Sequence, residues 1–230
     1  MTVQTDPPAR SWAQTVRVYF TPVMLSMIVL GFASGLPLYM VFQKLSYWLR
    51  DAGIERSTIG FFYWVTLSYT LKFLWAPIID RVQIPFLAKL LGPRRSWIVT
   101  AISGTVIALV IISQTDPTQG LAPVAIAAFL LAYSSATLDV AIDAWRIESA
   151  PNDMQANMAA AYSLGYRVAY MTSGLGLAIS EWADWDWSFL AMAAAMALSA
   201  GLVFLMKEPA TGTYKHALTG SLPTKIVKAV

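Results

Sequence analysis

Six stretches of this chain are apolar over a length that crosses a lipid bilayer, and this feature constrains the fold more than any other. A hydrocarbon core about 30 Å thick is spanned by about 20 residues of α-helix. Hydrophobic residues make up 57% of the 230 residues and charged residues only 13%. A water-soluble chain of this length would expose too much apolar surface, so we predict an all-α membrane protein with spans at 20–42, 59–79, 97–113, 121–145, 158–180 and 189–206.

Basic residues alternate between successive loops, which predicts the orientation of the chain in the membrane. They lie before the first span, in the second loop and in the tail. The loop after the third span, QTDPTQG, has none, and the loop after the fifth, EWADWDW, carries acids and tryptophans. The first loop is the exception, because Lys44, Arg50 and Arg56 fall there. Lys and Arg concentrate on the cytoplasmic side, so we predict a multi-pass protein with both termini in the cytoplasm.

The chain divides into three parts by composition. Residues 1–17 are polar and are predicted to be a disordered cytoplasmic terminus, and residues 18–208 form the six-helix bundle. Residues 209–230 turn from a Gly, Thr and Ser linker into the basic, apolar start of another element, where a missing second half would begin. The net charge of +3 is explained by the loops, so it indicates no nucleic-acid partner.

The sequence offers no constellation typical of an enzyme. It has no cysteine and a single histidine, His216 in the tail, so no thiol nucleophile, iron-sulfur cluster or histidine metal site is available. Two aspartates four residues apart are weak evidence for a metal on their own. We therefore predict that the protein is not an enzyme and holds no metal or cofactor.

Charged residues inside the spans are the most informative feature for function, because each costs about 2.5–3.5 kcal/mol at mid-membrane. Lys72 lies in the second span, Asp139 and Asp143 in the fourth, and Arg167 in the fifth, while the third and sixth spans have no ionisable residue. This distribution predicts a 3+3 inverted repeat in which the third helix of each unit faces lipid.

Helical spacing predicts which of these charges meet. Asp143 follows Asp139 by four residues and Arg146 follows Asp143 by three, so the three side chains share one stripe of their helix. The deeper end of the stripe offers a carboxylate to Arg167 or Lys72. At the shallow end, Arg146 is expected to reach lipid headgroups or loop acids such as Glu148. The alternative interpretation is an interhelical ion pair that only fixes the packing.

Two further patterns surround these charges. Tyr162, Tyr166 and Tyr170 follow each other at intervals of four residues beside Arg167, and phenol rings with hydroxyl tips suit a polar ligand, although tyrosines at this spacing are common in packing interfaces. In the first span, Gly31 and Gly35 permit close helix packing, and the proline that follows frees a backbone carbonyl. The first span is therefore expected to line a cavity or to pack closely on a neighbour.

Six quoted stretches together resemble one known family. GFASGLPLYMVF, YWLRDAGIERSTIGFF, LKFLWAPIIDR, GPRRSW, LDVAIDAWRIE and YSLGYRVAYMTSGLGLAISE occur in the order found in AmpG-type muropeptide permeases, a branch of the major facilitator superfamily related to acetyl-CoA and drug transporters. The resemblance covers residues 18–208. It implies that this chain is the amino-terminal six-helix bundle of a transporter made of two such bundles.

The resemblance also implies a function. AmpG-type permeases import anhydromuropeptides, the products of peptidoglycan recycling, across the bacterial inner membrane by proton symport and alternating access. By this resemblance the partners are an anionic sugar-peptide, a proton and the lipid bilayer. The alternatives are transport of another anionic small molecule, such as a CoA thioester, a siderophore or a drug, or a noncatalytic membrane subunit whose charges serve assembly.

The transporter interpretation assigns three sets of residues. Proton coupling falls to Asp139 and Asp143. Substrate binding falls to Arg167, Lys72, Tyr166, Tyr170 and Tyr39. The superfamily's latch, centred on the loop between the second and third spans, is assigned to Asp80, Arg81, Arg94, Arg95 and Arg146, with Gly92 in that loop. This sequence departs from the pattern of the latch, because Ala76 and Pro77 occupy the region where a glycine is usual.

Overall fold

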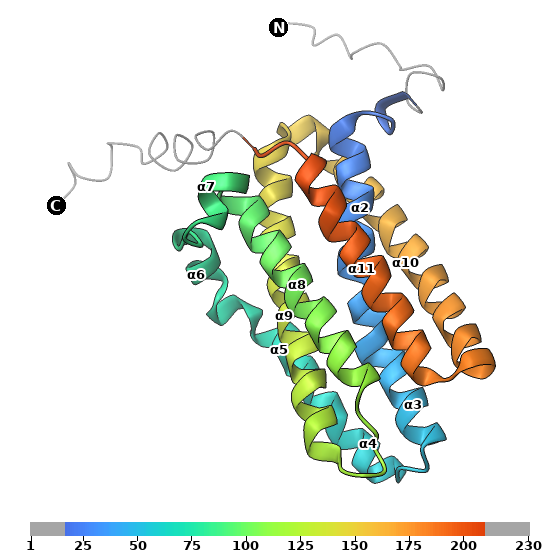
Figure 1. Cartoon of the computed structure of the whole chain (residues 1–230). Helices are drawn as coiled ribbons and strands as arrows, with labels where there is room; N and C mark the ends of the chain where they lie inside the picture. The colour runs from blue at the N-terminus through green and yellow to red at the C-terminus, as the bar shows by residue number, and fades with distance from the viewer. Residues whose placement is uncertain (1–16, 210–230) are drawn as a thin grey trace, which may run out of the picture.

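The structure is a computed structural model that describes residues 17–209. The segments predicted as a disordered terminus, 1–17, and as a linker, 209–230, fall outside this range apart from one residue each. The described residues are helical and include no strand. The long helices run side by side as a bundle (Figure 1). We name its two ends after residues that lie there: the Arg94 end, where α8 begins, and the Trp185 end, where α11 begins.

The first span is a single helix interrupted by a π-turn. It comprises α2 (Pro22–Tyr39), η1 (Met40–Lys44) and α3 (Leu45–Asp51). Pro37 lies inside α2 and lacks an N–H, and the π-turn begins three residues later. The helix continues to Asp51, nine residues beyond the predicted end at 42, because Leu45, Trp48 and Leu49 are buried against the bundle. Lys44 and Arg50 consequently lie in this helix and Arg56 begins the next one, so the prediction that these three residues lie in a loop was wrong.

The second predicted span is not one uninterrupted α-helix. It consists of α4 (Arg56–Phe62), the 3₁₀ turn η2 (Tyr63–Thr66), α5 (Leu67–Leu71), the 3₁₀ turn η3 (Lys72–Leu74) and α6 (Ala76–Arg81). Aromatic and β-branched residues, which are crowded in an α-helix, occupy η2. Pro77 sits in the first turn of α6, where it ends the preceding helix. A short helix, α7 (Leu87–Leu91), follows.

The remaining helices are long. They are α8 (Pro93–Ser113), α9 (Leu121–Ser149), α10 (Gln155–Ala183) and α11 (Trp185–Leu205), with the 3₁₀ turn η4 (Asn152–Met154) between α9 and α10. Within the described residues, four helices are long and apolar enough to cross a membrane: the first span, α8, α9 and α11. α10 is 29 residues long but carries polar residues along its length. The all-α membrane fold is confirmed, and six helical segments fit the predicted bundle.

Glycines bring α2 and α10 into backbone contact. A Cβ at Gly165 of α10 would overlap the Ile28 carbonyl and the backbone at Phe32, and a Cβ at Gly31 of α2 would overlap the Tyr162 carbonyl. The interpretation of the first-span glycines as packing residues is thus confirmed. Close approach of this kind replaces the hydrophobic driving force that helices lack in lipid.

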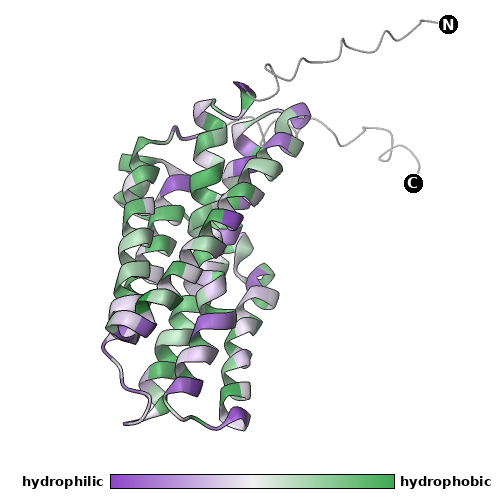
Figure 2. Ribbon diagram, turned by 90° about the vertical axis from the view of Figure 1, so that its right-hand side faces the viewer, coloured by the Kyte–Doolittle hydropathy of each residue, from purple (hydrophilic) through white to green (hydrophobic). Residues whose placement is uncertain are grey.

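Apolar residues make up much of the bundle, and hydrophilic residues lie at its ends and at scattered positions along the helices (Figure 2). Leu198 and Leu205 of α11 are 68% and 83% exposed, as expected of side chains in lipid. In the 18-residue apolar stretch of α11, 39% of the residues are buried, against 56% in the same stretch of each of the other three candidate spans. α11 therefore fits the prediction of a lipid-facing third helix. α8 does not fit it as well, because it packs between α9 and α11.

Candidate functional site

Lys72 and Asp139 meet in the middle of the bundle. Lys72 Nζ of η3 lies 3.5 Å from Asp139 Oδ2 of α9, and the Ser34 hydroxyl of α2 donates a hydrogen bond to Asp139 Oδ1. The side chains of Lys72 and Asp139 are 34% and 14% exposed. Of the two partners left open from the sequence, Lys72 is the one that reaches this carboxylate.

Two tyrosines of α10 extend this contact. The Tyr162 hydroxyl donates to Ser34 Oγ over 2.8 Å, and the Tyr166 hydroxyl lies 2.8 Å from the same oxygen. The two rings pack with their centroids 5.0 Å apart. We call the five residues Lys72, Asp139, Ser34, Tyr162 and Tyr166 the Asp139 cluster. Its members come from four helical segments, so any motion between those segments changes the surroundings of the carboxylate.

The broken second segment is what places Lys72 in this cluster. Trp75 follows the 3₁₀ turn and donates from Nε1 to Thr137 Oγ1 over 3.1 Å, and its ring packs on Tyr133 at 4.8 Å between centroids. Thr137 precedes Asp139 by two residues on α9. The tryptophan therefore fixes the segment to α9 next to the acid, and the 3₁₀ turn directs the lysine toward it.

The cluster is suited to exchange the partner of a carboxylate. An ion pair at 3.5 Å is long for a direct charged hydrogen bond, and Lys72 keeps a third of its side chain exposed. Inside a membrane protein an uncompensated charge is costly, so Asp139 must keep a cation, a proton or hydroxyl donors at all times. Ser34 is one donor already in place. A second positive charge, or a proton, could therefore replace the lysine.

The other predicted substrate residues lie outside the cluster. Arg167 is exposed on α10, and it forms no ion pair within the described part of the chain. Tyr170 is 55% exposed and meets the Tyr39 ring edge-on, with centroids 5.1 Å apart. Asp143 pairs with Arg146 at 3.3 Å on the surface of α9 rather than with a deep cation. None of these side chains forms a hydrogen bond or an ion pair with Asp139 in the described part of the chain.

A second group of charges lies at the Arg94 end. The Arg94 guanidinium lies 2.9 Å from Asp80 Oδ1 of α6 and 2.7 Å from Glu148 Oε1 of α9. The side chains of Arg94 and Glu148 are 14% and 13% exposed. The expectation that Arg146 reaches Glu148 was wrong, because Arg94 occupies that acid and Arg146 pairs one turn away with Asp143. The arginine ties the start of α8 to α6 and to the end of α9.

The start of α8 is capped by a residue that follows the last helix of the bundle. Glu208, three residues after α11, accepts the backbone N–H groups of Arg94 over 2.7 Å and Arg95 over 3.1 Å. Burial raises the pKa of Glu208 above its ordinary value even though these two donors favour the carboxylate. The Arg95 side chain donates to the last carbonyls of α11, those of Val203 and Phe204.

Two predicted latch residues, Arg94 and Asp80, are joined by an ion pair, and a third, Arg95, holds the end of α11. Arg81 is exposed at the end of α6 and has no ion pair among residues 17–209. Ser34 and Glu208 were not assigned a role from the sequence. Ser34 lies between the two packing glycines of the first span, which was the available signal. Glu208 gave no signal, because its partners lie more than a hundred residues away.

The described residues hold no group of three His, Cys, Asp or Glu side chains that could bind a metal. The site as described is built from charges and hydroxyl groups of this chain. Its two parts are one polar cluster at mid-bundle and one charged network at the Arg94 end, both joining segments that are far apart in the sequence.

Comparison with known families decides the class of protein. The model of the Major Facilitator Superfamily matches residues 23–228. The chain belongs to this superfamily. Membership confirms the resemblance, the fold class and the assignment to a transporter family rather than to an enzyme. No solved structure matches the chain at a significant level.

Several curated proteins are similar to this superfamily member. The anhydromuropeptide permease of Escherichia coli K12 is 34% identical over 200 residues, which are 86% of this chain and 40% of the relative. A putative AmpG 4 transporter of Rickettsia felis is 32% identical over 188 residues, 80% of this chain and 45% of the relative. An uncharacterized protein of Haemophilus influenzae is 38% identical over 193 residues, 83% of this chain and 44% of the relative. The chain thus spans less than half of the length of these relatives.

Proposed function

We propose that this chain supplies one half of the pathway of a proton-coupled importer of anhydromuropeptides that works by alternating access. The observation that carries the proposal is the Asp139 cluster, in which a partly exposed lysine and hydroxyl donors share one deep carboxylate. Similarity to an anhydromuropeptide permease supports the substrate. The alternating loop charges support a bacterial inner-membrane location with both termini in the cytoplasm.

In this mechanism the ion pair links proton binding to substrate binding. A proton on Asp139 neutralises the carboxylate and releases Lys72, whose ammonium group then pairs with a carboxylate of the substrate. Loss of the proton restores the pair between Lys72 and Asp139. A ligand shifts a conformational equilibrium only by its differential affinity for the two states, and here the differential contact is the one that Lys72 makes.

The remaining assigned residues have supporting roles in the proposal. Tyr166 supplies its hydroxyl group within the Asp139 cluster, and Tyr170 is exposed with its ring packed against that of Tyr39. Arg167 supplies a second positive charge to the substrate. Asp143 is the alternative proton acceptor, paired with Arg146. The network of Arg94, Asp80 and Glu148 holds the segments at the Arg94 end together in one access state.

The test is uptake of labelled anhydromuropeptide, driven by an imposed proton gradient, into membrane vesicles from cells that produce the protein. Asp139→Asn keeps the shape of the side chain and removes its charge. We expect uptake to fall at least about tenfold, equivalent to about 1.4 kcal/mol. Asp153→Asn, the same change at an exposed acid of η4, is the matched control and should leave uptake intact.

Membrane abundance separates transport from assembly. Asp139→Asn leaves Lys72 without its partner, so the double variant K72M/D139N removes both charges together. If the pair only fixes packing, the double variant regains abundance and uptake. If the pair is part of the pathway, the double variant regains abundance but not uptake. Unchanged uptake in Asp139→Asn and in Arg167→Ala would reject the site.

A further inference from the structure

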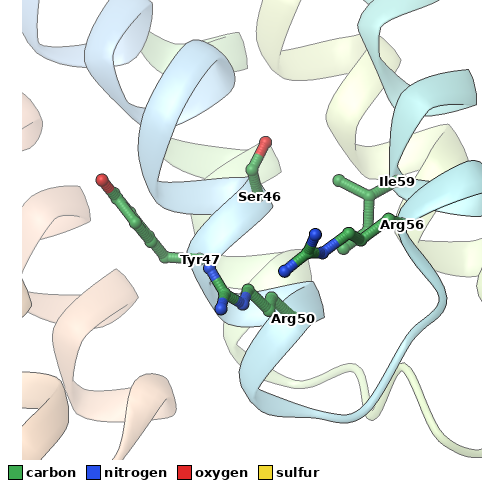
Figure 3. A pocket seen from close by; sticks show the side chains of 5 residues that line it. All are labelled: Ser46, Tyr47, Arg50, Arg56 and Ile59. Carbon is green, nitrogen blue, oxygen red and sulfur yellow. The ribbon is translucent and has the colours of Figure 1, made fainter.

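A cleft at the Trp185 end gathers two arginines that the mechanism above does not use. It lies between α3 and α4, has a volume of about 200 Å³, and is lined by Ser46, Tyr47, Arg50, Arg56 and Ile59. Figure 3 shows the guanidinium groups of Arg50 and Arg56 reaching into the same space from the two helices. The side chain of Ser46 borders this space, and Tyr47 lies on the side of α3 away from α4.

The arginines in this cleft have no carboxylate partner among the residues that the structure describes. Neither Arg50 nor Arg56 forms an ion pair with a carboxylate in the described range 17–209. The acid next to Arg50, Asp51, instead accepts a hydrogen bond from Trp185 Nε1 over 2.8 Å. Two like charges that share one cleft repel each other, and a bound anion between them reverses that repulsion. Guanidinium groups also match the two oxygens of a carboxylate in geometry.

The other lining residues favour an organic acid over a bare inorganic ion. The Ile59 side chain gives the cleft apolar surface from α4, and Tyr47, 53% exposed, borders the cleft from the far side of α3. Ser46 adds one hydroxyl group. A carboxylate that is attached to a sugar or a peptide matches this lining. The arginines bind the acid, and the remainder of the molecule covers the apolar side of the cleft.

A polar stripe connects this cleft with the middle of the bundle. Gln43, Ser46 and Arg50 follow each other at i+3 and i+4 along η1 and α3, and Tyr39 precedes Gln43 by four residues. Gln43 and Arg50 are exposed, and Tyr39 packs on Tyr170 beside the Asp139 cluster. A ligand released from the arginines thus meets polar side chains along the same helix.

We propose that this cleft binds a carboxylate of the transported molecule at the Trp185 end, before that molecule reaches the Asp139 cluster. The identity of the ligand rests on the proposed function, whereas anion binding by the two arginines does not. The assignment also accounts for two of the three basic residues that break the alternation of charge, since Arg50 and Arg56 serve the ligand rather than the topology.

Equilibrium binding of two labelled probes to the purified protein tests the proposal. The probes are citrate, a simple soluble carboxylate, and anhydromuropeptide, and the protein is held in nanodiscs of phosphatidylcholine. We expect the double variant R50Q/R56Q to bind each probe at least about tenfold more weakly. R50K/R56K keeps the charges but loses the planar fork, so its affinity should be intermediate. Lys89→Gln, an exposed change at the opposite end, should alter affinity by no more than about twofold.

The possible results separate the site from the proposed function. Equal citrate affinity in the wild type and in R50Q/R56Q overturns the anion site. Citrate binding that depends on the arginines, in a protein that does not bind anhydromuropeptide, supports the anion site and rejects the proposed substrate. In nanodiscs that contain phosphatidylglycerol, native mass spectrometry reports retained lipid. One result would assign the cleft to a lipid headgroup: phosphatidylglycerol displaces both probes from the wild type, and R50Q/R56Q no longer retains this lipid. That result would overturn the role of the cleft for the transported molecule.

Discussion

Two glycines on α10 provide a test of the helix crossing at the centre of the bundle. Gly165 lies against the backbone of α2, so a methyl group there would overlap the Ile28 carbonyl and the Phe32 amide nitrogen. Gly174, nine residues along the same helix, has no atom within 4 Å of the position that a Cβ would take. Gly165→Ala and Gly174→Ala therefore make the same chemical change with and without a steric consequence.

The magnitudes follow from two opposing terms. Alanine is favoured over glycine in a helix by about 0.5–1 kcal/mol, and this gain applies to both variants. Overpacking costs about 1–3 kcal/mol, and it applies only to Gly165→Ala. We expect the upper part of that range, because the atoms in the way belong to a backbone, which cannot change rotamer. Gly174→Ala should raise the free energy of unfolding, and Gly165→Ala should fall below it by about 1–3 kcal/mol.

The assay is reversible unfolding of the purified protein in dodecyl maltoside, titrated with sodium dodecyl sulfate and followed by far-ultraviolet circular dichroism. The difference between the two variants isolates the steric term, since the helix-propensity term cancels. Equal stability of Gly165→Ala and Gly174→Ala would refute the close approach of α2 and α10. Lower stability of both would show that α10 tolerates no alanine, and the argument from contact would also fail.

Three further predictions concern the exposed face and the Arg94 end. Because the chain has no cysteine, single cysteines report water access: Tyr170→Cys should react with a water-soluble thiol reagent, whereas Leu198→Cys, 68% exposed but on α11, should be protected by lipid. Arg94→Ala should reduce membrane abundance several-fold in immunoblots because it leaves two acids unpaired, and Arg94→Lys should retain part of it. Glu208→Gln removes a charge worth about 0.3–1 kcal/mol at the start of α8, so amide hydrogen exchange there should quicken in mass spectrometry.

The sequence placed a charge pair in the middle of the bundle but left two cations open as the partner of the carboxylate. A charge inside a span is costly, so a lysine and an aspartate at similar depths on different spans were expected to meet, and Lys72 and Asp139 do so. Arg167, deeper in its span, was the other candidate left open, because an arginine side chain is long enough to reach across the difference in depth. Depth along a helix says nothing about rotation around it, and α10 directs Arg167 to an exposed face.

Other features depend on contacts that local patterns do not report. The apolar window of the first span ends near residue 42, but burial of Trp48 and Leu49 continues the helix to Asp51. The 3₁₀ turn η3 of the second segment is followed directly by Trp75, which bonds to Thr137 of α9, and by Pro77 in the first turn of α6. Hydropathy describes each stretch alone, so it could not find either effect.

The cap at the start of α8 has a consequence for biosynthesis. Glu208 lies beyond the last helix of the bundle, yet it accepts backbone donors more than a hundred residues earlier in the chain. A ribosome therefore delivers α8 to the membrane long before it delivers the carboxylate that covers the first turn of α8. Until then, water, lipid headgroups or an insertion chaperone must satisfy those N–H groups. The start of α8, in the first half of the bundle, is therefore fully capped only after residue 208 has left the ribosome.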